Sequence, residues 1–285
     1  MAKKFEELTI SDDFMFGIIM RDPRYCKPFL ERVLSISLDH IEYPKIQETI
    51  DIDVEAKSIR LDVYVDDGNN TVYNIEMQNS NNRNLPMRMR YYQDVIDLNL
   101  LDKGQNYDEL KTNLVIFVCT FDPFGLGRHF YSFENICIED HDLSLNDGTK
   151  KIMLNTKGIL DDISPDLKRL LDFIDGAKPA DDFTRDLDSA VKNARLSTKW
   201  RVEYMNLQLA YQEKYREGLK VGEERGIKLG EERGLKLGEE RGLKLGELAE
   251  KKETAKRMLS DGKLSIEEIS LYSGLSVEDI KALKI

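Results

Sequence analysis

Apolar and polar residues alternate most clearly over residues 58–78, SIRLDVYVDDGNNTVYNIEMQ. Every second position from 59 to 65 is apolar, which is the pattern of a half-buried strand. The DDGNN sequence at 66–70 follows, and Asp, Gly and Asn accept the positive φ angles of tight turns. A second strand is expected to run from Val72 to Gln78. The pattern therefore predicts a β-hairpin in which Glu76 and Gln78 share one face.

Helical and extended patterns continue on both sides of this hairpin. The expected helices are residues 8–20, 23–34, 85–103, 164–174 and 181–215. The expected strands outside the hairpin are residues 41–54, 112–121, 129–138 and 151–154. The run at 112–121, TNLVIFVCTF, is nearly all apolar, which is typical of a strand buried on both faces. This order of helices and strands predicts an α/β fold.

A glycine repeat occupies residues 218–246, where every fourth residue is glycine and the octapeptide GEERG(I/L)KL recurs in three tandem copies. Glu and Lys alternate at i,i+4 spacing, and each such pair favours a helix by about 0.2–0.5 kcal/mol. Each glycine disfavours the helix by about 1 kcal/mol relative to alanine, so such a helix needs a partner. Glycine lets backbones approach closely, and we expect a homodimer through 218–246. The alternative is a flexible linker.

The tail, residues 248–285, has the pattern of a small helical unit that resembles a helix-turn-helix. Ser265 and Ser276 are the expected helix caps. The second helix of this unit starts with Glu278 and Asp279, and these acids suit a helix N-terminus but not a reader of the DNA major groove. We therefore interpret the tail as a packing or partner-contact unit, with DNA recognition as the alternative.

Composition places the chain among soluble globular proteins with a solvated portion. Its 285 residues are 41% hydrophobic and 33% charged. No apolar run approaches the ~20 residues of a membrane helix, and the N-terminus lacks the apolar region of a secretory signal. The three cysteines are odd in number and widely spaced, which argues against a disulfide framework or a CxxC metal site. We expect a cytoplasmic protein without a membrane partner.

The formal net charge of −11 argues against non-specific DNA binding by the protein surface as a whole. It leaves room for a local basic groove. Arg83, Arg88 and Arg90 lie just beyond the hairpin, and residues 192–220 form a basic-leaning helical stretch.

Candidate chemistry centres on the acids of the hairpin. Asp62 can reach the face of Glu76 and Gln78 if the hairpin register allows it. Two carboxylates and an amide oxygen are the hard ligands that Mg²⁺ requires. The alternative is a hairpin whose outer face is simply solvated. Both acids lie in apolar runs, where burial of a charge is costly unless a metal or a partner compensates.

RLDVYV at 60–65 and NIEMQ at 74–78 resemble the D…(D/E)xK core of the PD-(D/E)XK nucleases. They are most similar to the recombination-promoting nuclease (Rpn) family, whose members are often labelled transposases. The resemblance covers roughly residues 5–160 and includes IMLNTKG at 152–158. It implies a restriction-endonuclease-like core with a mixed central sheet flanked by helices, Asp62 and Glu76 as Mg²⁺ ligands, and DNA as the substrate.

Further site residues follow from the same resemblance. Gln78 stands where the family pattern usually has lysine, although an ExQ form also occurs in the family. Asp13, in DDFMF, matches an acid that the family carries in this segment. The resemblance therefore implies that Asp13 is an outer member of the metal site, and the alternative is a helix cap or a surface acid. Arg88, Arg90 and Tyr92 on the following helix are candidates to hold phosphates or Gln78, with surface arginine and core tyrosine as the alternative.

Four segments are predicted: a nuclease-like domain (1–160), a helical extension (161–217), the glycine repeat (218–247) and the tail (248–285). The predicted function is that of a metal-dependent DNA endonuclease linked to recombination or mobile-element transposition. One alternative is a weak or inactive nuclease-like module that binds DNA and self-associates through its C-terminal repeat. Another makes the tail an inhibitor that occludes the nuclease in the dimer.

Overall fold

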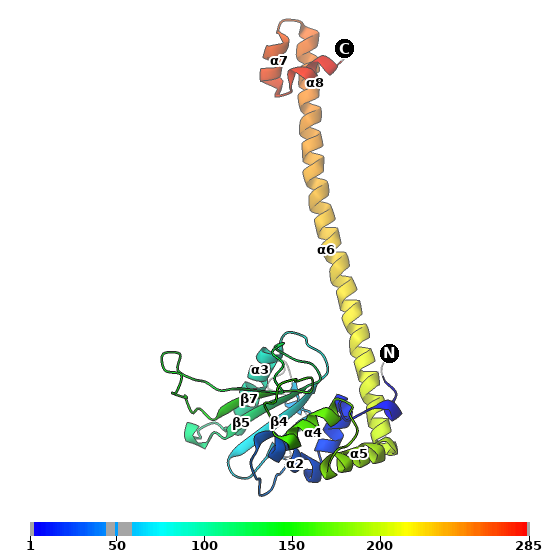
Figure 1. Ribbon diagram of the computed structural model, residues 1–285. Helices are drawn as coiled ribbons and strands as arrows, with labels where there is room; N and C mark the ends of the chain where they lie inside the picture. Colours follow the sequence, from blue (N-terminus) through cyan, green and yellow to red (C-terminus); the bar gives the residue numbers. More distant parts are fainter. Residues whose placement is uncertain (1–2, 44–48, 51–58, 284–285) are drawn as a thin grey trace. The chain divides into compact units, whose positions relative to one another are not determined.

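The computed structural model describes residues 3–43, 49–50 and 59–283, and it divides into two compact units, Met1–Gln208 and Leu209–Ile285. The helices of the first unit are α1 (Asp13–Met20), α2 (Pro23–Leu34), α3 (Leu85–Leu100), α4 (Pro165–Ile174), α5 (Asp182–Arg195) and the first residues of α6 (Thr198–Asp261) (Figure 1). Its strands are β1 (Thr49–Ile50), β2 (Ile59–Arg60), β3 (Val63–Asp66), β4 (Thr71–Gln78), β5 (Thr112–Cys119), β6 (Phe130–Phe133) and β7 (Thr149–Asn155). Two 3₁₀ turns, η1 (Phe5–Glu7) and η2 (Tyr107–Glu109), complete it.

The central sheet has the strand order β3-β4-β5-β7-β6. β4, β5 and β7 are parallel, whereas β3 and β6 run antiparallel at the two edges. β1 and β2 form a separate two-stranded pair. The predicted hairpin is confirmed as β3 and β4, and its turn places Gly68 and Asn70 at φ angles of 71° and 70°. The mixed sheet between helices confirms the predicted fold class.

Helices cover both faces of this sheet. Tyr73, Ile75 and Met77 of β4 point to one face and belong to the main core, together with buried residues of α1, α2, α4 and α5. The opposite face lies under α3, whose Val95 and Ile96 pack against Val72 (Figure 1). Because side chains alternate along a strand, every even-numbered residue of β4 faces α3.

Two predicted elements differ from the structure. The single helix predicted over 181–215 is broken after Arg195, and α6 starts at Thr198. The hydroxyl of Ser197 accepts the backbone N–H of Trp200, and such local hydrogen bonds favour helix starts over helix interiors. Of the strand predicted over 41–54, the structure shows β1 and an isolated bridge of Glu42 with Asp66, while residues 44–48 and 51–58 lie outside the described residues.

The second unit consists of the rest of α6, with α7 (Ile266–Ser273) and α8 (Val277–Ala282). Its small core joins Ala255 of α6 to Ile269, Leu275 and Ile280. The predicted caps are confirmed, because the hydroxyls of Ser265 and Ser276 accept N–H groups of the first turns of α7 and α8. Gly274 ends α7 at φ 67°, a conformation in which glycine avoids strain.

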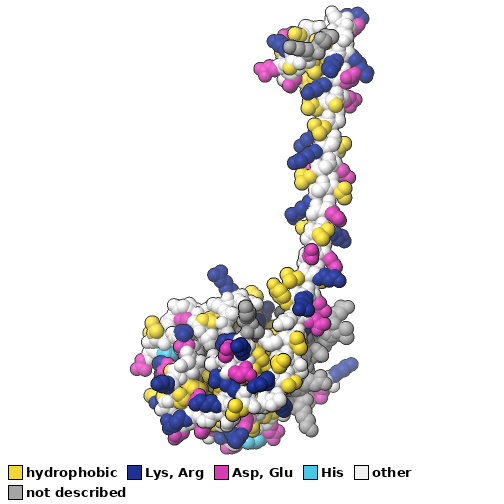
Figure 2. All heavy atoms as spheres, turned by 90° about the vertical axis from the view of Figure 1, so that its right-hand side faces the viewer, with side chains coloured by type: hydrophobic (Ala, Val, Ile, Leu, Met, Phe, Trp, Pro, Cys, Tyr) yellow, Lys and Arg dark blue, Asp and Glu magenta, His cyan; other side chains and the backbone are white. Residues whose placement is uncertain are grey.

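The glycine repeat is helical and exposed throughout as part of α6. Figure 2 shows apolar and charged side chains interspersed along it. A Cβ added at any glycine from Gly218 to Gly246 would meet nothing within 4 Å. Within the described residues, no helix is both long and apolar enough to span a membrane.

Candidate metal and phosphate site

The middle of β4 carries buried polar side chains on the face that α3 covers. Asn74, Glu76 and Gln78 are 0%, 2% and 6% exposed, and β3 and β5 pair with β4 on its two sides. The strand is held there by its other face, where Tyr73, Ile75 and Met77 enter the core. The fold therefore forces three polar groups into the interior.

Asp62 lies beside Glu76, as the sequence predicted if the register allowed it. Val63 pairs with Ile75, so Asp62 and Glu76 are the next positions along the two strands. The backbone N–H of Asp62 donates to Oε1 of Glu76 at 3.1 Å, and the backbone N–H of Met77 donates to Oδ2 of Asp62 at 3.1 Å. Each carboxylate is thus held by a backbone N–H group from the side of the hairpin that carries the other acid. Asp62 is half-buried and gives the pair its access to solvent.

Burial raises the pKa of Glu76 well above its ordinary value, and the neighbouring charge of Asp62 raises it further. The hydrogen bond from the Asp62 N–H and the positive charge of Arg88 oppose this rise without cancelling it. A second carboxylate beside a buried one is costly unless a cation lies close to both.

Arg88 of α3 binds the third polar group of the strand. Its Nη1 donates to Oε1 of Gln78 at 2.8 Å and its Nη2 to the hydroxyl of Tyr92 at 3.0 Å. The guanidinium also stacks near the rings of Tyr92 and Phe117, with its central carbon 5.4 and 5.6 Å from their centroids. Arg88 therefore brings a fixed positive charge to the place where Gln78 supplies none.

A buried clamp holds α3 on the sheet, and sequence reasoning missed it. Gln93 Nε2 donates to the backbone carbonyl of Asn113 at 3.1 Å, and Asn113 Nδ2 donates to the carbonyl of Gln93 at 3.2 Å and to Oδ1 of Asp97 at 2.8 Å. Lys151 of β7 also donates to Oε1 of Gln93. One signal was available in the sequence, since Asn113 interrupts an otherwise apolar run.

Comparison with protein families gives a match over residues 24–148, to the family described as PD-(D/E)XK nuclease family transposase. Over this range, which is less than half of the chain, the sequence is similar to that family. The resemblance drawn from RLDVYV and NIEMQ is thereby confirmed. Comparison with curated proteins and with solved structures gave no match.

The matched range begins in α2 and ends before β7, so it contains Asp62, Glu76, Gln78 and Arg88 but not Asp13. Asp13 is the exposed first residue of α1, and its Oδ1 accepts the N–H of Phe14 at 2.7 Å. Arg90, which the sequence grouped with Arg88, is exposed on α3. Of the two arginines, Arg88 is the one whose side chain donates a hydrogen bond to the side chain of Gln78.

The donor set of the matched range fits a divalent cation at Asp62 and Glu76. Both ligands are carboxylates, which Mg²⁺ prefers, and an ion between them would offset the buried charge that raises the pKa of Glu76. Among the residues that the structure describes, no group of three or more His, Cys, Asp and Glu side chains has the arrangement of a metal site. The fit is therefore to an ion held by two protein carboxylates, with its other positions open, as catalytic Mg²⁺ sites require.

Proposed function

We propose that this protein is a Mg²⁺-dependent DNA endonuclease. The observation that carries the proposal is the buried Glu76 carboxylate held against Asp62 within the range that is similar to the PD-(D/E)XK nuclease family. Two acids placed together, one of them buried, are a cost that a cation removes.

Each side chain has a role in phosphodiester hydrolysis. Asp62 and Glu76 would hold the cation, which would lower the pKa of a bound water and offset the charge that develops on the phosphate. Arg88 fixes the amide of Gln78, and its charge would stabilise the negative charge that a phosphate oxygen gains in the transition state. Gln78 orients by hydrogen bonds, because its neutral amide carries no charge of its own. Arg88 thus takes over the electrostatic part of the role that a lysine has in the family pattern.

A plasmid-nicking assay with and without Mg²⁺ tests this proposal. Asp62→Asn and Glu76→Gln keep the shape of each side chain, and we expect either to reduce cleavage by at least about 10²-fold. Asp94→Asn is the matched control, since Asp94 is exposed on α3. Equal cleavage by wild type and both variants would exclude the assigned site.

A second candidate is a DNA-binding module of the same family that has little or no activity. Gln78 in place of the usual lysine favours it, as does the near-complete burial of Glu76 and Gln78. Under this alternative neither the intact chain nor the chain truncated after residue 208 cleaves DNA, while both retain binding that depends on Arg88. Cleavage by the truncated chain alone would instead support the tail as an inhibitor. A role in recombination or transposition would follow from cleavage and rests on the family.

Self-association through residues 218–246 is a further part of the proposal. The glycines leave the backbone of α6 open, and each octapeptide carries two acidic and two basic side chains, so a second copy meets no net repulsion. Replacing Gly226, Gly230 and Gly234 by alanine blocks close backbone approach, and we expect the mass measured by sedimentation to fall to that of one chain. Lys252→Ala, on the exposed surface of the same helix, should leave the mass unchanged. A wild type that is already monomeric would exclude this part.

A further inference from the structure

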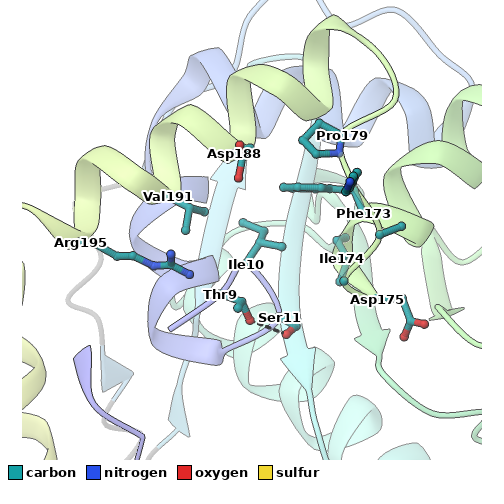
Figure 3. A pocket seen from close by; sticks show the side chains of 13 residues that line it. Thr9, Ile10, Ser11, Phe173, Ile174, Asp175, Pro179, Asp188, Val191 and Arg195 are labelled. Carbon is teal, nitrogen blue, oxygen red and sulfur yellow. Dashed lines mark hydrogen bonds between the residues drawn. The ribbon is translucent and has the colours of Figure 1, made fainter. Parts of the chain in front are cut away.

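A cavity of about 320 Å³ lies in the first unit, outside the site described above. It is bounded by residues 9–11 before α1, by the end of α4 with the loop to α5, and by one side of α5 (Figure 3). Its volume is in the range of about 300–1,000 Å³ that small-molecule sites occupy in proteins. The apolar part of its wall consists of Ile10, Phe173, Ile174, Pro179 and Val191.

The acids of this cavity are already neutralised by cations outside its wall. Asp175 forms an ion pair with Lys157 at 2.8 Å and accepts the hydroxyl of Thr156, also at 2.8 Å. Its carboxylate points away from the middle of the view in Figure 3. Asp188 forms an ion pair with Lys192 at 2.6 Å. Neither acid therefore leaves a full negative charge for a ligand.

The cations of the wall have no such partner. Arg195 points toward Ile10 and Thr9 (Figure 3), and its Nε donates to the backbone carbonyl of Leu8 at 2.7 Å. This bond fixes the side chain. In the part of the chain that the structure describes, neither Arg195 nor Lys178 forms an ion pair with a carboxylate. The hydroxyls of Thr9 and Ser11 are hydrogen-bonded to each other at 2.8 Å, so the cations are the principal donors left for a ligand.

The cavity is also tied to the end of β4. The side-chain amide of Asn79 donates to the backbone carbonyl of Ser11 at 2.8 Å, and Asn79 directly follows Gln78. One wall of the cavity is thereby attached to the strand that carries Glu76.

We infer that the cavity binds a phosphate monoester carried on a nucleoside. Arg195 and Lys178 would hold the phosphate by charge-assisted hydrogen bonds, and the apolar wall would contact the sugar and base. The ligand is either a free nucleotide or the phosphorylated end of a DNA strand. The second source rests on the proposed nuclease function, whereas the first does not.

Isothermal titration of the full-length protein with thymidine 5′-monophosphate, in EDTA so that no cleavage occurs, tests the inference. We expect this probe to bind more tightly than thymidine or inorganic phosphate. Arg195→Gln and Lys178→Gln should each weaken it by about tenfold or more, the loss of one charged hydrogen bond. Arg185→Gln is the matched control, because Arg185 lies on α5, pairs with Asp182 and does not line the cavity. It should change the dissociation constant by less than about twofold.

Lys178→Gln keeps the test valid if Arg195→Gln fails to fold, since Lys178 is exposed. Val191→Phe, which fills the cavity from its apolar side, should abolish binding of the probe. No binding of the probe, or equal binding by wild type and Val191→Phe, would overturn the inference. If cleavage requires Glu76 but the probe does not bind, the cavity inference fails alone, whereas binding without cleavage leaves it standing.

Two oligonucleotides of one sequence, with and without a 5′-phosphate, identify the source of the ligand. Tighter binding of the phosphorylated strand than of the nucleotide, lost in Lys178→Gln, assigns the cavity to a DNA end. Binding of the nucleotide alone, with no competition by either strand, assigns it to a free nucleotide.

Discussion

β4 and the glycine repeat of α6 invert the usual relation between polarity and burial. β4 encloses Asn74, Glu76 and Gln78, none more than 6% exposed, whereas the repeat leaves its isoleucine and leucines between 50% and 70% exposed. The two regions differ in what holds them. The opposite face of β4 places Tyr73, Ile75 and Met77 in the core and so fixes the strand, which leaves its polar face free to serve chemistry. The repeat has no apolar face at all.

The periods of the two sequences explain this difference. A strand repeats every two residues, so alternate residues of β4 stay on one face over its whole length. The glycines of the repeat recur every four residues, and each step turns them by about 40° around an α-helix. The apolar residues recur with the octapeptide and turn by about 80° per copy. Neither set accumulates on one side, and a straight partner can contact only part of the repeat.

The largest expected difference between these regions is in how much stability is lost when an apolar side chain is shortened to alanine. Ile75 is fully buried in β4, and Ile75→Ala should lower the free energy of unfolding by about 2–5 kcal/mol. Leu243 is 70% exposed in the repeat, and Leu243→Ala should change it by less than about 0.5 kcal/mol. Urea unfolding of both variants measures the two values. A loss at Leu243 as large as that at Ile75 would show that the repeat is buried by a partner in solution.

Glu76 makes the stability of the first unit depend on pH. The pKa of Glu76 in the folded chain is raised above the ordinary value of 4.5. The stability that the protonated side chain contributes is therefore fully present below pH 4.5, and it is lost as pH rises through the folded pKa. Glu76→Gln removes this loss. In EDTA, we expect the variant to gain stability relative to wild type as pH increases from 4.5 to 8. Parallel pH profiles in urea unfolding would show that burial of Glu76 carries no such cost.

Mg²⁺ should increase the stability of the wild type, whereas a rise in pH in EDTA decreases it. An ion bound at Asp62 and Glu76 stabilises the folded state by about 2.7 kcal/mol at 100 times its dissociation constant. The stabilisation should be absent in Glu76→Gln, which serves as the control. If Mg²⁺ shifts the unfolding midpoint of wild type and Glu76→Gln equally, the ion binds elsewhere.

Much of the candidate site was predictable because it depends on local pattern. Alternation and the DDGNN turn predicted the hairpin, and the pleat placed Glu76 and Gln78 on one face. The partners of these residues were less accessible. Arg88 was a candidate by its position alone, and nothing local distinguishes its contact with Gln78 from the solvent exposure of Arg90.

The long-range contacts were beyond sequence reasoning for a physical reason. Gln93 and Asn113 are 20 residues apart and meet only because α3 crosses the sheet above β5. The break between α5 and α6 was also missed, although Ser197 and Thr198 are residues that favour helix starts, and the hydroxyl of Ser197 accepts the N–H of Trp200 there. Tertiary packing and side-chain capping override propensity at these places.

The clamp under α3 should affect the site through Arg88. Gln93→Leu removes the side-chain donor to the backbone carbonyl of Asn113 and the amide oxygen that accepts from Lys151, and we expect a loss of about 1–3 kcal/mol in stability. If the clamp positions Arg88, then Gln93→Leu and Arg88→Ala will weaken DNA binding non-additively. Binding at two salt concentrations with the two single variants and the double variant measures this coupling. Additive losses would limit the clamp to a structural role.

The smallest expected effect is the change in local stability when one glycine in each region is replaced by alanine. The change should have opposite signs in the two regions. Gly234→Ala places a Cβ in open space on α6, and the gain in helix propensity should stabilise the repeat locally by about 1 kcal/mol. Gly68→Ala, in the turn before β4, must adopt φ +71° and places its Cβ 2.9 Å from the ring of His40, which should cost about 1–2 kcal/mol. Hydrogen exchange of amides near each position reads both changes separately. Faster exchange around Gly68 is expected at any protein concentration, and slower exchange around Gly234 is expected where the chain is dilute enough to be monomeric. Faster exchange around Gly234 at concentrations that favour self-association is the result that the proposed contact through the glycines predicts.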